Sequence, residues 1–234
     1  TSVICSDKTG TLTQNKMTLT DIYDASTQQL VDIKEQGAES EKMIISLGVL
    51  CSEGKVSIDA SGTAVGIGDP TETSIIVAAA NIGIYKDELL AKYPRLGTLP
   101  FDSDRKMMTS VHEMDGKIIV IVKGAFDVIS QRCTSGHVEA GQEANQEMST
   151  QALRVLALAT KEIAAYDESL TSEDLERDLE FKGRFGMIDP ARPEAKRAIA
   201  ICRAAGIRPV MITGDHILTA SAIAEELGIL QPQD

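Results

Sequence analysis

The chemically most informative stretch of the sequence lies near its start and reads Ile4-Cys5-Ser6-Asp7-Lys8-Thr9-Gly10-Thr11-Leu12-Thr13. An apolar strand predicted over residues 2–5 leads directly into a polar turn, so Asp7 lies where open α/β sheets bind their ligands. A carboxylate there can attack a phosphoryl group and form an aspartyl-phosphate. Lys8 can neutralise developing charge, and the turn offers N–H groups and hydroxyls to phosphate oxygens. The alternative is a helix cap or hairpin turn, because these residue types are common in turns.

The whole run from Ser6 to Thr13 resembles the phosphorylation signature of the P-type cation-transporting ATPases. Related phosphatases of the haloacid dehalogenase superfamily usually carry a second Asp two residues after the nucleophile, as general acid and base. This sequence has Thr9 there, which cannot do that work, so a long-lived phosphoenzyme fits better than a fast hydrolase. The resemblance implies that Mg²⁺ bridges the phosphate, the Asp7 carboxylate and the Thr9 carbonyl.

A second strand, predicted as buried over residues 207–212, delivers Thr213, Gly214 and Asp215 to its carboxyl end. Helices predicted before and after it repeat the strand, crossover and strand order of parallel α/β units. Asp7 and Thr213 are therefore expected to face one phosphate. The hydroxyl and N–H groups of this turn would stabilise the transferring phosphoryl group.

A candidate nucleotide site lies in the middle of the sequence. Two apolar runs, residues 107–114 and 117–122, are separated by Asp-Gly, a strong hairpin signal. The segment before them contains Phe101, in a chain with only 3% aromatic residues and no Trp. An isolated Phe is ordinarily a core residue. However, residues 100–106 resemble the adenine-binding strand of the P-type ATPase nucleotide domain, which implies that adenine stacks on Phe101 beside Lys106.

Three further residues are assigned to the nucleotide site. The run Lys123-Gly124-Ala125 resembles the nucleotide-contacting lysine motif of the family, with Lys123 supplying positive charge beside Gly124. Glu72 stands where a capping-box acid would lie, after Asp69 and Pro70 at a predicted helix start. The resemblance to calcium pumps implies instead that Glu72 faces the base, and both roles are left open.

Arg154 and a proline-bracketed segment complete the candidate residues. Arg154 lies at the polar end of an otherwise apolar, buried strand, and the resemblance gives it a phosphate contact. Asp189 and Arg192 lie in Asp189-Pro190-Ala191-Arg192-Pro193, a stiff connection. A hinge salt bridge between them is the structural interpretation. The resemblance places the segment at the hinge between the nucleotide and phosphorylation domains, and both residues are grouped with the nucleotide site.

Composition excludes several classes of protein. A chain of 234 residues with 43% hydrophobic residues can bury a substantial core. A formal net charge of −12 argues against nucleic acid or an anionic membrane surface as a partner. The cysteines show no C-x-x-C spacing, so no zinc site or disulfide framework is indicated. His112, His137 and His216 are expected to be surface or loop residues.

The resemblance covers nearly the whole chain and implies an α/β fold. Residues 1–16 and 189–234 would form a partial haloacid-dehalogenase-like, Rossmann-type phosphorylation domain. Residues 17–188 would form an inserted α+β nucleotide-binding domain with an antiparallel sheet. Helices are predicted over residues 39–50, 70–83, 125–133, 139–153, 194–205 and 217–227, and strands over 2–5, 16–24, 107–114, 117–122, 154–160, 181–188 and 207–212.

The implied function is ATP-driven cation transport, with Ca²⁺ the expected ion, from the cytoplasmic side of a membrane. ATP and Mg²⁺ would be the cofactors, and transmembrane and actuator domains of the same protein the partners. Family members also carry a Gly-Asp-Gly-x-Asn-Asp motif for magnesium, which this sequence lacks, so weak phosphorylation is expected. The resemblance further implies that the strand before Asp7 is flanked on its other side by a strand beyond Asp234, so an exposed sheet edge open to a second molecule is expected. The alternatives are a nucleotide-binding module alone or a soluble phosphatase.

Overall fold

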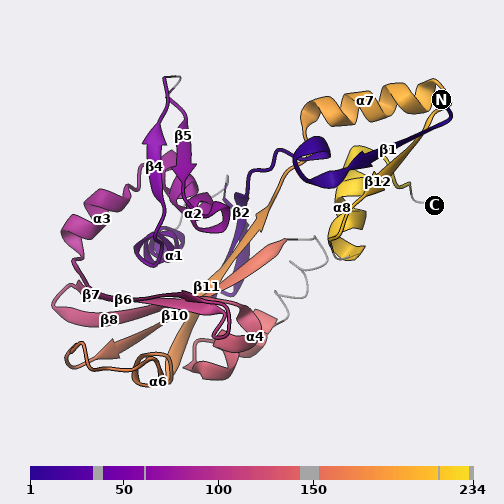
Figure 1. The fold of residues 1–234 in the computed structure, drawn as a ribbon. Helices are drawn as coiled ribbons and strands as arrows, with labels where there is room; N and C mark the ends of the chain where they lie inside the picture. The colour runs from indigo at the N-terminus through magenta and orange to yellow at the C-terminus, as the bar shows by residue number, and fades with distance from the viewer. Residues whose placement is uncertain (34–38, 61, 143–152, 216, 232–234) are drawn as a thin grey trace.

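An eight-stranded, mostly antiparallel sheet, here called the large sheet, forms the bulk of the computed structural model (Figure 1). The structure describes residues 1–33, 39–60, 62–142, 153–215 and 217–231. The strand order is β3-β2-β11-β10-β8-β7-β6, and β9 pairs with β11. The strands are β2 (Thr18–Asp24), β3 (Gln29–Asp32), β6 (Arg95–Asp102), β7 (Met107–Met114), β8 (Lys117–Gly124), β9 (Cys133–Ser135), β10 (Arg154–Ile163) and β11 (Leu179–Ile188).

Apolar side chains cover both faces of the large sheet. Helices α1 (Glu39–Leu50) and α2 (Pro70–Asn81) pack on one face, where Ile45 and Ile75 join Phe185 in a buried cluster. Gly48 permits this packing, because a Cβ there would lie 2.5 Å from the Phe185 ring. The other face is covered by short elements, α4 (Phe126–Ile129) and α6 (Ser172–Leu175), which bury Phe126, Ile129 and Leu175. The remaining elements are α3 (Lys86–Lys92) and the hairpin of β4 (Lys55–Ile58) and β5 (Ala64–Ile67).

A separate two-stranded sheet, the small sheet, lies to one side of this body (Figure 1). Its strands β1 (Val3–Asp7) and β12 (Arg208–Ile212) pair in parallel, with Asp7 opposite Ile212. Helices α7 (Pro193–Ala204) and α8 (Ile217–Leu227) enclose a small core that includes Leu12 and Ile199. The strand predicted over residues 207–212 is confirmed as β12, but its predicted burial is wrong. Only Pro209 of β12 is buried, and the strand pairs with β1 alone in the described part of the chain.

Several sequence predictions agree with the structure. The mixed α/β architecture with an antiparallel sheet is confirmed, as are helices over residues 39–50 and 217–227. The β7–β8 hairpin turns at Asp115 and Gly116, whose φ angles of 51° and 79° suit a two-residue turn. Most of the helix predicted over residues 139–153 lies outside the described residues. Within the described ranges, no helix has the length and apolar character needed to cross a membrane.

Candidate functional site

The turn after β1, residues 8–13, is held tightly from within and is here called the signature turn. Gly10 has a φ of +77°, a conformation that glycine adopts without strain. The Thr13 N–H donates to the Lys8 carbonyl at 3.0 Å and closes the turn. Asp7, just before the turn, is exposed, whereas Lys8 is buried. The carboxylate predicted as nucleophile is therefore open to an incoming group, beside a lysine fixed by packing.

The small sheet brings the two predicted phosphate-binding turns to one edge. Because β1 and β12 are parallel and Asp7 pairs with Ile212, both strands end at the same level. Lys8 forms an ion pair with Asp215 across this edge. The N–H of Asp215 donates to the Thr213 hydroxyl at 3.1 Å. The predicted parallel pairing is confirmed, and the roles of Thr213, Gly214 and Asp215 stay predictions.

Asp189 and Arg192 both bind the signature turn. Asp189 accepts hydrogen bonds from the Thr13 hydroxyl at 2.6 Å and the Lys16 N–H at 3.0 Å. The Arg192 guanidinium donates to the carbonyls of Thr13 at 2.8 Å and Gly10 at 3.2 Å. The interpretation of Asp189 and Arg192 as a hinge salt bridge is wrong, because each side chain forms hydrogen bonds with the signature turn instead.

Phe101 lies at the end of β6 and is 62% exposed, which excludes the alternative of an ordinary core Phe. A tight turn follows, in which Asp102 accepts from the N–H groups of Asp104 and Arg105, each at 2.9 Å. These backbone hydrogen bonds, that of Arg105 first, lower the pKa of Asp102. Lys106, at the end of the turn, is exposed, with its Nζ 3.4 Å from Asp127. The turn thus presents an aromatic ring and a cation on the surface.

Lys123 is buried at 3% exposure and lies between two partners on the helix-covered face. Its Nζ donates to the Ser52 hydroxyl at 2.6 Å and to Glu72 Oε1 at 3.1 Å. The other oxygen of Glu72 accepts from the Glu53 N–H at 2.8 Å. A capping role for Glu72 is wrong, because Asp69 caps α2 and the Glu72 carboxylate bonds elsewhere.

Gly124 and Arg154 complete the predicted nucleotide residues. A Cβ on Gly124 would lie 2.3 Å from the Lys106 carbonyl oxygen, so only glycine allows this approach of the chain. Arg154, at the start of β10, is exposed and donates to the Thr71 hydroxyl at 3.1 Å. Arg154 and Lys123 therefore both contact the first turn of α2, Arg154 at Thr71 and Lys123 at Glu72.

A cleft of about 490 Å³ joins the signature turn to the start of α2. Lys8, Thr9 and Asp215 line one side, and Thr71 and Arg154 line the other. Asp7, Phe101 and Lys123 are not among its lining residues. The structure thus assembles the candidate residues into a cleft and two flanking groups, one at Asp7 and one at the β6–β8 end of the large sheet.

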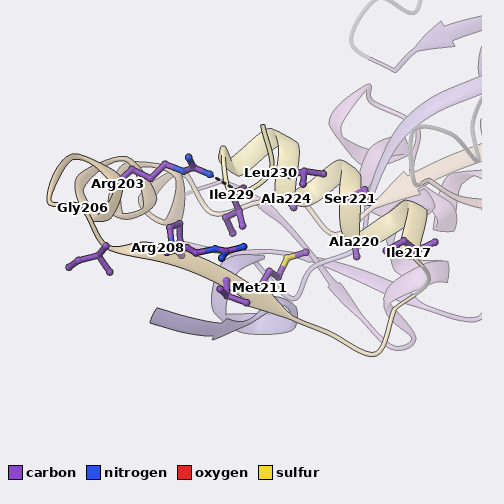
Figure 2. Close-up of a pocket in the computed structure, with 13 residues that line it drawn as sticks. Arg203, Gly206, Arg208, Met211, Ile217, Ala220, Ser221, Ala224, Ile229 and Leu230 are labelled. Carbon is purple, nitrogen blue, oxygen red and sulfur yellow. Dashed lines mark hydrogen bonds between the residues drawn. The ribbon is translucent and has the colours of Figure 1, made fainter. Parts of the chain in front are cut away.

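A second and larger groove, about 660 Å³, lies between β12 and α8 (Figure 2). Arg203 donates to the Ile229 carbonyl at 2.6 Å along one wall. Apolar residues such as Ile217 and Ala224 line much of the rest. None of the predicted site residues lines this groove, so its size alone carries no functional assignment.

Two cations absent from the sequence-based candidates, Lys86 and Arg95, support the Lys123 group. Lys86 donates to the carbonyls of Ser52 at 2.7 Å and Gly54 at 2.8 Å. Arg95 donates to the Leu50 carbonyl at 2.5 Å. Burial lowers the pKa of Lys86. These contacts fix the loop after α1 that carries Ser52, and no local motif signals them.

His112 also differs from expectation, because it is fully buried in β7. Its Nδ1 lies 3.0 Å from the Tyr93 carbonyl oxygen and its Nε2 lies 3.1 Å from the Ser110 hydroxyl. Burial lowers the pKa of this imidazole. His137 is exposed as predicted, and His216 lies outside the described residues. In the described ranges, no three His, Cys, Asp or Glu side chains form a metal-binding group.

Comparison with known proteins identifies the family. The family model described as P-type ATPase, cytoplasmic domain N, matches residues 41–194, more than half of the chain. The chain therefore belongs to the P-type ATPases, and the matched residues correspond to their cytoplasmic domain N. These residues include Glu72, Phe101, Lys123 and Arg154.

Similar proteins are bacterial transport ATPases. A "Calcium-transporting ATPase 1" of Bacillus cereus is 42% identical over 98% of this chain and 26% of its own length. A protein of the same name from Lactococcus lactis is 39% identical over 100% of this chain and 27% of its length. A "Cation-transporting ATPase pma1" of Synechocystis is 36% identical over 100% of this chain and 29% of its own length. The chain thus spans less than a third of the length of these relatives.

Proposed function

We propose that this chain is the nucleotide-binding and phosphorylation region of a cation-transporting P-type ATPase. ATP binds at the end of the large sheet, and its γ-phosphate is transferred to Asp7, forming the aspartyl-phosphate that drives transport. The observation that carries the proposal is the 62% exposure of Phe101 within a matched domain N. An aromatic ring left in solvent beside Lys106 has the properties of a stacking platform for a base. Ca²⁺ is the proposed ion, because most of the similar proteins reported above are named for calcium transport.

The proposed division into domains follows the two sheets. Residues 1–16 and 189–234 form a haloacid-dehalogenase-like phosphorylation domain, and residues 17–188 form the inserted nucleotide-binding domain. The parallel pairing of β1 with β12 supports this division, because it joins segments from opposite ends of the chain. The connections near Lys16 and Asp189 lie side by side and are tied by a hydrogen bond of 3.0 Å.

At the nucleotide end, the residues supply complementary contacts. Phe101 stacks on the adenine, and Lys106 and Arg154 offer positive charge to the phosphates. The buried Lys123 and the half-buried Glu72 place one donor and one acceptor 3.1 Å apart, a combination suited to the edge of a base. Gly124 allows the end of β8 to pack closely against the backbone of Lys106, which carries one of these charges.

At the acceptor end, Asp7 is the nucleophile and Lys8 neutralises charge as the phosphoryl group arrives. Thr213 and Gly214 donate hydrogen bonds to its oxygens, and Asp215 holds Lys8 in place. The Asp7 carboxylate and the Thr9 carbonyl are hard oxygen ligands of the kind that Mg²⁺ prefers, so they fit this ion. Bound Mg²⁺ would neutralise phosphate charge. Asp189 and Arg192 keep the turn that carries these groups in shape.

The parent protein would hold this region on the cytoplasmic side of a membrane, joined to transmembrane and actuator domains. A second molecule is a further proposed partner, through the exposed edge of the small sheet. Nucleotide binding without phosphorylation is the second candidate function. It is favoured by the family match, which covers domain N.

Calorimetry of ATP binding tests the nucleotide site. Phe101→Ala should weaken ATP binding by about 1–3 kcal/mol if the ring stacks on adenine. Tyr85→Ala is a matched control, because Tyr85 is also an exposed aromatic residue, at 42%, on a different part of the surface. Unchanged affinity for ATP in Phe101→Ala would refute the stacking role.

Labelling with ATP carrying radioactive γ-phosphate tests the acceptor. If Asp7 accepts the γ-phosphoryl group, incubation with Mg²⁺ should leave acid-stable, hydroxylamine-sensitive label on the chain, and Asp7→Asn should abolish it. Label that is lost in Asp7→Asn would exclude the second candidate, whereas no label on a chain that still binds ATP would contradict the role of Asp7 and favour the second candidate.

A further inference from the structure

Glu176 is a buried acidic residue outside the site described above. It follows directly after α6 on the face of the large sheet opposite α1 and α2, and its side chain is fully buried. Its Oε1 is bound by the Arg105 guanidinium and accepts from the Thr109 hydroxyl at 2.7 Å. Arg132 lies 4.0 Å from Oε2 and donates to the Glu176 carbonyl at 3.2 Å. The carboxylate is thus an anionic centre beneath the end of β6.

Arg105 links this buried carboxylate to the surface ring. Its Nη1 binds Glu176, and its Nη2 donates to the Pro100 carbonyl at 2.8 Å. That carbonyl belongs to the peptide bond leading into Phe101. Because the Phe101 ring is 62% exposed, its position depends on the backbone beneath it more than on packing. A planar guanidinium can hold both groups at once, in fixed relative positions.

The turn after Phe101 adds a second constraint on the same backbone. The Lys106 N–H donates to the Asp102 carbonyl at 2.7 Å, and Lys106 has a φ of +54°. A residue other than glycine seldom adopts this backbone conformation in an unconstrained chain. The Arg105 contact and the turn therefore fix the segment from Pro100 to Lys106 from both ends.

The ion pair between Arg105 and the buried Glu176 is better explained by the geometry that it imposes on the backbone than by a gain in stability. Replacing a buried ion pair with apolar residues is often neutral or stabilising, whereas a charge network fixes a unique arrangement. The second oxygen of Glu176 has no hydrogen-bond donor among the described residues, which makes the arrangement costly.

We propose that Glu176 is a positioning residue for nucleotide binding, which acts through Arg105 on the peptide that carries Phe101. This inference rests on the proposed function of Phe101.

A double-mutant cycle on the 234-residue chain, with ATP as the calorimetric ligand, tests the proposal. Glu176→Gln keeps the shape of the side chain and removes its charge, so it should weaken ATP binding about tenfold. In the Phe101→Ala background, the same substitution should weaken binding by less than about twofold, because its target is already gone. Glu162→Gln is the matched control, since it removes an exposed carboxylate paired with Lys117 and should leave the affinity unchanged.

A second variant keeps the test decisive if Glu176→Gln does not fold. Arg105→Lys retains a positive charge near Glu176 but has no fork that reaches the Pro100 carbonyl as well. It should show the same coupling to Phe101. Parent-like ATP affinity in both variants, or an equal loss in both backgrounds, would overturn the positioning role alone if Phe101→Ala still weakens binding. Full ATP affinity in Phe101→Ala would instead overturn the nucleotide site, and this inference with it.

Discussion

The large and small sheets differ in how completely their strands are covered. Strand β7 is buried along nearly its whole length, because helices pack on one face and short elements on the other. Strand β1 is mostly exposed, with Val3 at 47%. The cluster under α1 and α2 contains 18 buried residues among those described, against 5 in the small core. The proposed nucleotide residues thus stand on the well-covered part, and the proposed acceptor on the sparsely covered one.

This difference implies unequal stability within one chain. Local opening is easiest where few apolar contacts hold the backbone hydrogen bonds. A site that recognises a base needs fixed geometry, and the large sheet supplies it. A turn that must receive a phosphoryl group from elsewhere tolerates more freedom.

Truncating the core of the large sheet should produce the largest loss. Phe185→Ala should lower the free energy of unfolding by about 3–5 kcal/mol, because it opens a cavity between the sheet and α1. Urea denaturation measures the change. Ile201→Ala is the control: this α7 residue is 70% exposed, and its loss should change stability by less than about 0.5 kcal/mol. A small effect of Phe185→Ala would contradict a tightly packed large sheet.

Hydrogen exchange should separate the two sheets by a smaller margin. Amides of Val3 to Cys5 and of Val210 to Ile212 should exchange at least about 100-fold faster than those beside the Asp115–Gly116 turn. That ratio corresponds to a difference of about 2.8 kcal/mol in opening free energy. Equal protection of both sheets, in a chain shown to be monomeric, would remove the contrast.

The Asp189 contacts should matter on a still smaller scale. Asp189→Asn weakens its bonds to the Thr13 hydroxyl and the Lys16 N–H, which should destabilise the signature turn by about 1–2 kcal/mol. Exchange rates of the amides in residues 8–13 report this loss. Thr13→Val should reproduce it and Thr13→Ser, which keeps the hydroxyl, should not. Identical rates in the two Thr13 variants would show that the hydroxyl bond contributes nothing.

His112 should add a modest pH dependence to the large sheet. Burial lowers its pKa below the usual 6.5, so the unfolded chain binds a proton at a higher pH than the folded chain does. Stability should therefore be highest above pH 6.5 and fall as the pH drops from 6.5 to the folded-state pKa. His112→Gln should flatten this decline, and His137→Gln, at an exposed position, should not. A decline that persists in His112→Gln would assign it to other groups.

Local signals predicted much of the fold. Asp69 and Pro70 marked the start of α2, and the Asp-Gly pair located the β7–β8 turn, because caps and tight turns depend on neighbouring residues only. The first part of β6, residues 95–99, was not predicted, since Gly97 and Pro100 interrupt the pattern of the strand and its pairing with β7 is irregular. His112 was misplaced because a strand buried on both faces can hold a polar residue that finds partners.

The candidate site was only partly predictable. The signature stretch around Asp7 is contiguous, so its spacing could be interpreted directly. The Lys123 group is assembled from Ser52 and Glu72, 71 and 51 positions away in the sequence. Glu176 likewise meets Arg105 across 71 positions. Such contacts depend on tertiary packing and have no local pattern.

The most direct test of the account is a residue-resolved NMR titration of the 234-residue chain with ATP. We expect the largest amide shift changes at residues 101–106 and 123–124, at one end of the large sheet, and at residues 71–72, at the start of α2. Amides of β12 and α8 should change little, and Phe101→Ala should reduce the changes in all three segments. Largest changes along the groove between β12 and α8, or none at the end of β6, would contradict it.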